Sequence, residues 1–167
     1  MDPTVAAEVA LTLSFVVFGV AGWRLMPWIR ALPTATALTL LLWPHAFRHI
    51  ALQIFSAQRA GFNVSDATRD QIAYGDVLGM LLAIVAIFLF YRGWPGARLV
   101  AWAFVVETVL DFANALTASL REQTLGVANG LTWLILTFYV PLLWVTLILV
   151  VWQLLSRRGE ASSSPGG

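Results

Sequence analysis

The sequence predicts an all-α fold, a polytopic membrane helix bundle with five transmembrane helices, or four in an alternative reading. Of its 167 residues, 59% are hydrophobic and 11% are charged, whereas a soluble domain carries about 25% charged residues. The apolar residues form long runs, such as MLLAIVAIFLFY over 80–91 and LTWLILTFYVPLLWVTLILVVW over 131–152. Because about 20 residues of helix cross the hydrocarbon core of a bilayer, these runs are transmembrane candidates.

The predicted spans follow one another with short polar or Gly/Pro-rich separators, which mark turns and loops. They run over about 5–27, 35–57, 71–91, 97–120 and 128–156. The alternative of four spans arises because Glu8 and Arg24 flank a fairly short apolar stretch, which could lie in the interface instead. With either number of spans, residues 1–158 are predicted to form a single transmembrane domain. The low-complexity segment GEASSSPGG over 159–167 is expected to be a flexible cytoplasmic tail.

The arginines predict the orientation of the spans. With an external N-terminus, six of the ten arginines fall on the cytoplasmic side, three fall outside and Arg48 lies within the membrane. The cytoplasmic six are Arg24, Arg30, Arg92, Arg98, Arg157 and Arg158, and the external three are Arg59, Arg69 and Arg121. The positive-inside rule therefore favours a multi-pass protein of the cell membrane with its N-terminus external and its C-terminus cytoplasmic.

Composition excludes several kinds of membrane chemistry. The chain has no Cys, which excludes Fe–S clusters, thiolate metal sites and covalent c-type haem. It has no Lys, so a retinal Schiff base has no amine to use. A net charge of +1 without a basic patch argues against nucleic acid as a partner. The expected partners are membrane lipids, a second copy of the chain in a homodimer, or a larger membrane complex.

Polar side chains inside the predicted spans are the candidate functional residues. A charged group near the bilayer centre costs about 2.5–3.5 kcal/mol on insertion scales, so such groups usually face the bundle interior and pair. The second span carries His45, Arg48, His49 and Gln53, the third carries Tyr74 and Asp76, and the fourth carries Glu107, Asp111 and Asn114.

Helical spacing predicts that these side chains form one site. The second-span residues fall at i, i+3, i+4 and i+8, and those of the fourth span fall at i, i+4 and i+7, which places each set on one helix face. Counted from the span ends, the two sets also lie at matching depths. One arginine does not neutralise three carboxylates, so the site is expected to be anionic and to take up a proton, a cation or a cationic ligand.

The preferred hypothesis is a membrane protein that handles a lipid-soluble ligand, a proton or a cation at this site, with or without catalysis. Its candidate acid–base or binding groups are Glu107, Asp111, His45 and His49. The candidate ligand contacts are Arg48, Gln53, Asp76, Asn114 and Tyr74.

Two other functions remain open. In an accessory subunit of a larger complex, the polar cluster would be structural, with Arg48 locked to Asp111 or Asp76, and Gly75 and Gly79 would favour close helix packing. In a metal protein, His45 and His49 with Glu107 and Asp111 would supply two nitrogen and two oxygen ligands for Zn or Fe. Arg48 would repel such a dication unless it turned toward Asp76.

Three short motifs carry a family resemblance. They are PHAFRH over 44–49, AYGD over 73–76 and the carboxylates of the fourth span. Over residues 43–150 the chain resembles small bacterial multi-pass integral membrane proteins. The resemblance implies the membrane bundle and brings no activity or cofactor with it.

Overall fold

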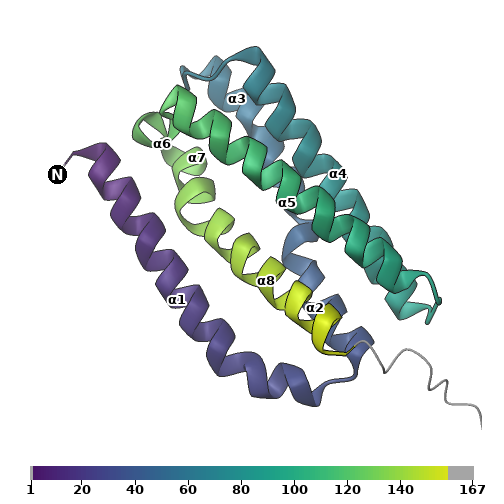
Figure 1. Cartoon of the computed structure of the whole chain (residues 1–167). Helices are drawn as coiled ribbons and strands as arrows, with labels where there is room; N and C mark the ends of the chain where they lie inside the picture. The colour runs from purple at the N-terminus through teal and green to yellow at the C-terminus, as the bar shows by residue number, and fades with distance from the viewer. Residues whose placement is uncertain (1, 158–167) are drawn as a thin grey trace, which may run out of the picture.

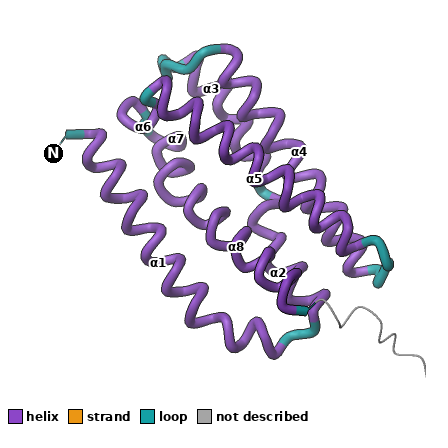
Figure 2. Tube along the Cα trace, in the orientation of Figure 1, coloured by secondary structure: helices purple, strands orange, loops and turns teal. Residues whose placement is uncertain are grey.

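The computed structural model describes residues 2–157, and within them every regular element is a helix (Figure 2). Four helical stretches are long and apolar enough to span a membrane: α1 (Pro3–Ala31), α4 (Asp66–Tyr91), α5 (Ala97–Glu122) and the stretch Gly130–Ser156. They run alongside one another as an elongated bundle (Figure 1). The predicted all-α membrane bundle is therefore confirmed. The predicted tail, 159–167, lies outside the described residues.

The predicted second span is not one continuous helix. It consists of α2 (Thr34–Ala46), the 3₁₀ helix η1 (Arg48–Gln53) and the short α3 (Ile54–Arg59). The three pieces follow α4 from one end of the bundle to the other (Figure 1). Pro44 lacks the N–H that would bond to the carbonyl of Leu40, and α2 ends two residues later. This segment is the one of the five predicted spans that is not among the four stretches long and apolar enough to span a membrane.

The last span also changes its helical geometry. After the short α6 (Thr124–Val127), it runs from α7 (Gly130–Leu134) through a π-helical turn, η2 (Ile135–Tyr139), into α8 (Val140–Ser156). Pro141 cannot donate to the carbonyl of Thr137, and the π-helical turn lies directly before it. π-Helical turns are rare in proteins, and many of those that do occur lie at functional sites.

The hydrophobic core occupies one half of the bundle, which we call the core half. It is formed by α2, most of α8, the C-terminal parts of α1 and α4, and α5 as far as Phe112. Its fully buried members include Leu38, Leu42, Ala101, Phe104 and Val150. In the opposite half, a much smaller cluster joins Ile54, Phe62, Val64 and Ala73. The polar residues of interest lie between these two clusters and in the opposite half.

Arginines join the helices at the end of the core half that lies farthest from the Arg48 cluster. Arg157 donates from Nη1 to the carbonyl of Leu32 at 2.7 Å, which joins the end of α8 to the α1–α2 turn. Arg98 donates from Nη2 to the carbonyl of Leu154 at 2.8 Å, which joins α5 to α8. The Arg30 guanidinium lies 4.5 Å from the centre of the Trp152 ring. Cations are favourable where helix carbonyls are left without partners, so this end of the bundle is tied together.

Candidate functional site

The site is organised around the side chain of Arg48, which is completely buried. Its Nε donates to Oδ1 of Asp76 at 2.7 Å, and its Nη2 donates to Oδ2 of Asp111. Its Nη1 donates to the hydroxyl of Thr108 at 3.0 Å and lies 3.6 Å from Oε2 of Glu107. We call Arg48, Asp76, Glu107, Thr108 and Asp111 the Arg48 cluster. It joins η1 to both α4 and α5.

Two glycines on α4 make room for the Arg48 cluster. A Cβ atom on Gly79 would lie 2.6 Å from Cζ of Arg48 and 2.8 Å from Oε2 of Glu107. A Cβ atom on Gly75 would lie 2.6 Å from Cγ of Asp111. All three distances are shorter than real Cβ contacts, so a larger residue at either position would displace the charged groups. Gly75 and Gly79 therefore seat the Arg48 cluster as well as allowing close helix packing.

The Arg48 cluster contains one formal positive and three formal negative charges. Thr108 accepts from Arg48 and donates from its hydroxyl to Oε2 of Glu107 at 3.1 Å, so Glu107 is held by two contacts. The side chains of Asp76, Glu107 and Asp111 are 16%, 12% and 8% exposed. Of these three carboxylates, Asp76 and Asp111 line the cavity described below, so they are the members of the cluster that can meet a ligand there.

His45 is buried beside the Arg48 cluster but binds a different element. Its Nε2 lies 3.1 Å from the hydroxyl of Thr146, which itself donates to the carbonyl of Leu142 at 2.8 Å. Since that hydroxyl has a single proton, Nε2 of His45 is the donor in this hydrogen bond. Its Nδ1 is buried and has no hydrogen-bond partner among residues 2–157, and its ring packs edge-on against Phe104 at 4.8 Å between ring centres. His45 thus connects α2 to α8 in the core half.

Three candidate residues lie outside this arrangement. His49, Asn114 and Tyr74 are exposed, with Tyr74 at 70%. The predicted alignment of His49 with His45 on one helix face is wrong, because the chain leaves the α-helix after Ala46 and continues as a 3₁₀ helix. The predicted stripe on the fourth span ends at Asp111, since Asn114 faces outward.

The metal arrangement expected from the sequence is not formed. With His49 on the outside, His45 and His49 do not converge with Glu107 and Asp111. Among residues 2–157 there is no group of three or more His, Cys, Asp or Glu side chains placed to hold a metal ion. The carboxylates that lie together surround the guanidinium of Arg48 instead.

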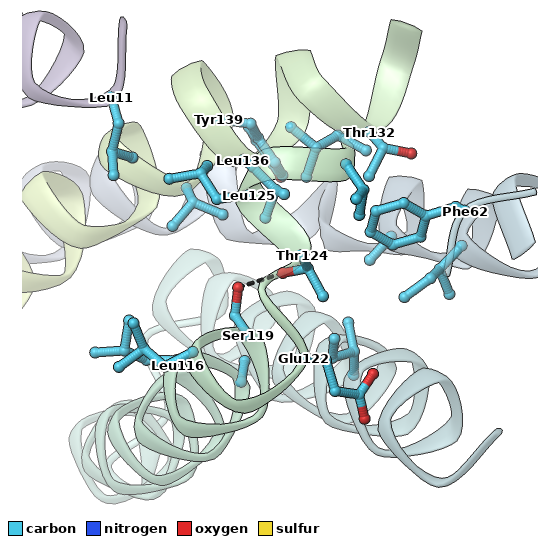
Figure 3. A pocket seen from close by; sticks show the side chains of 18 of the residues that line it. Leu11, Phe62, Leu116, Ser119, Glu122, Thr124, Leu125, Thr132, Leu136 and Tyr139 are labelled. Carbon is cyan, nitrogen blue, oxygen red and sulfur yellow. Dashed lines mark hydrogen bonds between the residues drawn. The ribbon is translucent and has the colours of Figure 1, made fainter. Parts of the chain in front are cut away.

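A cavity of about 810 Å³ lies next to the Arg48 cluster, in the half of the bundle opposite the core, which we call the cavity half. Figure 3 shows Leu11 of α1, Leu136 and Tyr139 of η2, and Leu116 and Ser119 of α5 around it. Asp76 and Asp111 line it where it meets the cluster. The remaining lining includes Thr4, Glu8, Ala51, Gln53, Ile54, Phe62, Phe112, Ala115, Glu122, Thr124, Leu125, Thr132, Leu143 and Trp144.

Several cavity residues were not predicted from the sequence. Gln53 was predicted as a ligand contact. Its side chain donates to the hydroxyl of Thr132 at 3.1 Å and so joins η1 to α7. Tyr139 was not predicted. Its hydroxyl donates at 2.6 Å to the carbonyl of Pro44, which also accepts from the backbone N–H of Phe47 at the end of α2. The two intramembrane prolines, Pro44 and Pro141, were the available signal, because each leaves backbone carbonyls in need of a partner.

Comparison with known proteins gives a family and no further information. No curated protein and no solved structure is significantly similar to the chain. One family model, described as "Domain of unknown function (DUF8737)", matches residues 6–155, which cover all the spans and the whole of the Arg48 cluster. The chain therefore belongs to the DUF8737 family.

Proposed function

We propose that this protein binds a lipid-soluble amphiphile in the cavity, with the polar head of the ligand at Asp76 and Asp111. The observation that carries the proposal is the position of the cavity. The cavity has a volume of about 810 Å³ and lies beside a buried charged cluster, within the membrane-spanning part of the bundle. Ligand pockets are typically about 300–1,000 Å³, mostly apolar, with a few polar groups that orient the ligand.

The composition of the walls supports an amphiphilic ligand. Most of the lining is apolar, and it includes Leu11 of α1, Leu116 of α5 and Leu136 of η2 (Figure 3). The polar groups are concentrated at the Arg48 cluster and among the residues near the helix ends, such as Glu122 and Thr124. An alkyl or ring system would contact the walls, and a polar head would reach the carboxylates.

The alternative is that the Arg48 cluster only stabilises the bundle, as in an accessory subunit. Arg48 does join three elements, and a buried arginine with several partners is costly to disrupt. A purely structural cluster needs no adjoining pocket, however, and here two of its carboxylates line a pocket of about 810 Å³. The cavity therefore favours ligand binding, with Arg48 positioning the two aspartates.

A matched pair of tryptophan substitutions on α5 tests the proposal. Ala115 lines the cavity, whereas Ala113 is exposed on the outer face of the same helix. Binding of dodecylamine, dodecanol and dodecanoate to the purified chain in neutral detergent would be counted by native mass spectrometry. We expect at least one probe to bind to the wild-type chain and to Ala113→Trp but not to folded Ala115→Trp. Equal binding of every probe to both variants would overturn the proposal.

We also propose that the cavity half faces the outside of the cell membrane. Among residues 2–157, the arginines at the end of the core half are Arg24, Arg30, Arg92, Arg98 and Arg157, against Arg59, Arg69 and Arg121 at the other end. This excess supports a cytoplasmic core half and an external N-terminus. Because the chain has no Cys, single cysteines report the orientation directly.

The orientation test uses the exposed Ala67, at the cavity end, and the exposed Gly96, at the core end. An impermeant maleimide applied to intact cells should label Ala67→Cys and should label Gly96→Cys only after permeabilisation. The reverse pattern, or labelling of both variants in intact cells, would contradict the proposed orientation.

A further inference from the structure

We infer that the ligand of the cavity is a lipid-soluble ammonium, an amphiphile with a cationic amine head. This inference rests on the proposed function and specifies its ligand class. The first observation is the charge of the lining. Glu8, Asp76, Asp111 and Glu122 all line the cavity, and no arginine or histidine of residues 2–157 does. A positively charged head is therefore the one that complements the walls.

The second observation concerns the free oxygens at the inner end of the cavity. Asp76 uses Oδ1, and Asp111 uses Oδ2, to accept from Arg48. The other oxygen of each carboxylate accepts no hydrogen bond from any group within residues 2–157. A carboxylate can accept several hydrogen bonds, so both can still receive an N–H donor or lie against an alkylammonium.

The third observation is a set of aromatic rings at the same end of the cavity. Phe112 and Trp144 lie with their ring centres 4.9 Å apart, and Tyr139 lines the cavity with them. The face of an aromatic ring attracts a cation, most strongly for Trp, and aromatic rings are used to recognise quaternary ammonium groups. Phe112 already lies 5.2 Å from the guanidinium of Arg48. Carboxylates beside aromatic rings are thus a suitable receptor for an amine head.

An anionic head such as that of a fatty acid finds no counterpart here. Arg48 is the nearest cation, yet its Nε, Nη1 and Nη2 already donate to Asp76, Thr108 and Asp111, and it does not line the cavity. A carboxylate head would face the two aspartates without a cation of its own. The formal charge of the Arg48 cluster, two negative charges in excess, would be lowered by an ammonium and raised by a carboxylate.

The test compares probes that share one alkyl chain and differ in their heads. Dodecylamine, dodecyltrimethylammonium, dodecanol and dodecanoate are titrated against the wild-type chain in neutral detergent at neutral pH, with Ala115→Trp as the control for binding outside the cavity. We expect both ammonium probes to bind at least about tenfold more tightly than dodecanol, equivalent to about 1.4 kcal/mol. Dodecanoate should bind more weakly than dodecanol.

Two substitutions on α4 test the source of this preference. Asp76→Asn removes a cavity carboxylate, and Asp70→Asn removes one that does not line the cavity. Asp76→Asn should reduce the preference for ammonium over dodecanol, and Asp70→Asn should leave it unchanged. If Asp76→Asn does not fold, Glu8→Gln replaces it, because the exposed side chain of Glu8 lines the cavity and is held by no other described residue.

The outcomes separate this inference from the proposed function. If dodecanol or dodecanoate binds as tightly as the ammonium probes and Ala115→Trp abolishes that binding, the cavity is a ligand site and the cationic preference is wrong. If Ala115→Trp alters the binding of no probe, both the inference and the proposed function are wrong. A preference for ammonium that Asp70→Asn reduces as much as Asp76→Asn would show general surface attraction and would also overturn the inference.

Discussion

The two halves of the bundle are built differently although the same helices run through both. In the core half, α2, α4, α5 and α8 pack around fully buried residues such as Leu38 and Phe104. In the cavity half, the buried apolar cluster is small, and a cavity of about 810 Å³ lies between parts of α1 and α5, with η2 along its wall. The boundary between the halves is the Arg48 cluster, where α2 has ended and η1 begins.

The charges follow the same division. Within residues 2–157, every Asp and Glu lies in the cavity half or in the Arg48 cluster, whereas five arginines gather at the end of the core half. Arg98 and Arg157 use their guanidinium groups to bond helix-end carbonyls and close that end. The apolar helices alone therefore do not determine which half of the bundle is tightly packed. The position of the helix break after α2 and the placement of the charged residues distinguish the two halves.

The largest effect is expected where the two halves meet. Arg48→Met would leave three carboxylates without their shared cation, and removing one partner of a buried ion pair costs about 3–5 kcal/mol. We expect almost complete loss of folded protein, measured as the monodisperse fraction in detergent. The control is Arg121→Met, since Arg121 is exposed and forms no hydrogen bond with the described residues.

A double-mutant cycle refines this prediction. Asp111→Leu alone leaves Arg48 with fewer acceptors, and the combination with Arg48→Met removes both members of that pair. The double variant should yield more folded protein than Arg48→Met alone, because Asp111→Leu removes a buried carboxylate that has lost its partner. If the double variant yields no more folded protein than Arg48→Met, the two residues do not stabilise each other, and the boundary between the halves needs another explanation.

An intermediate effect is expected at the glycine beneath the guanidinium. In Gly79→Ala, the new methyl group would meet Arg48 and Glu107 at distances that real contacts do not reach. Overpacking of this kind costs about 1–3 kcal/mol, so the unfolding midpoint in detergent should fall. Gly19→Ala is the matched helical control, because a Cβ atom there would meet nothing within 4 Å. Equal midpoints for both variants would mean that the Arg48 cluster is not tightly seated on α4.

The smallest effect is expected at the break in the second span. Tyr139→Phe removes the hydrogen bond to the carbonyl of Pro44 and keeps the ring in place. A single neutral hydrogen bond contributes about 0.5–1.5 kcal/mol, so the midpoint should fall slightly. Tyr91→Phe is the control, since Tyr91 is 85% exposed. If the two variants have the same midpoint, Tyr139 does not support the end of α2.

The sequence was sufficient to predict the membrane bundle and the four charged residues of the Arg48 cluster, but not Thr108. A buried arginine must find partners, and Asp76, Glu107 and Asp111 were the acids within reach by depth. The outward position of His49 was not predictable from helical spacing, because that spacing assumes an unbroken helix and the chain changes geometry beyond Pro44. The cavity was not predictable either. It depends on how α1 and α5, some hundred residues apart in the chain, are held at a distance by η2 and α6.

The central claim is that one half of the bundle is packed and the other is hollow, and two tryptophan substitutions on α5 test it most directly. Ala101 is completely buried in the core half, and Ala115 lines the cavity. Measured as unfolding midpoints in detergent, Ala101→Trp should abolish cooperative unfolding of a native state, whereas Ala115→Trp should stay close to the wild-type chain. Equal losses at the two positions would contradict the account, because they would show that the cavity half is as closely packed as the core half.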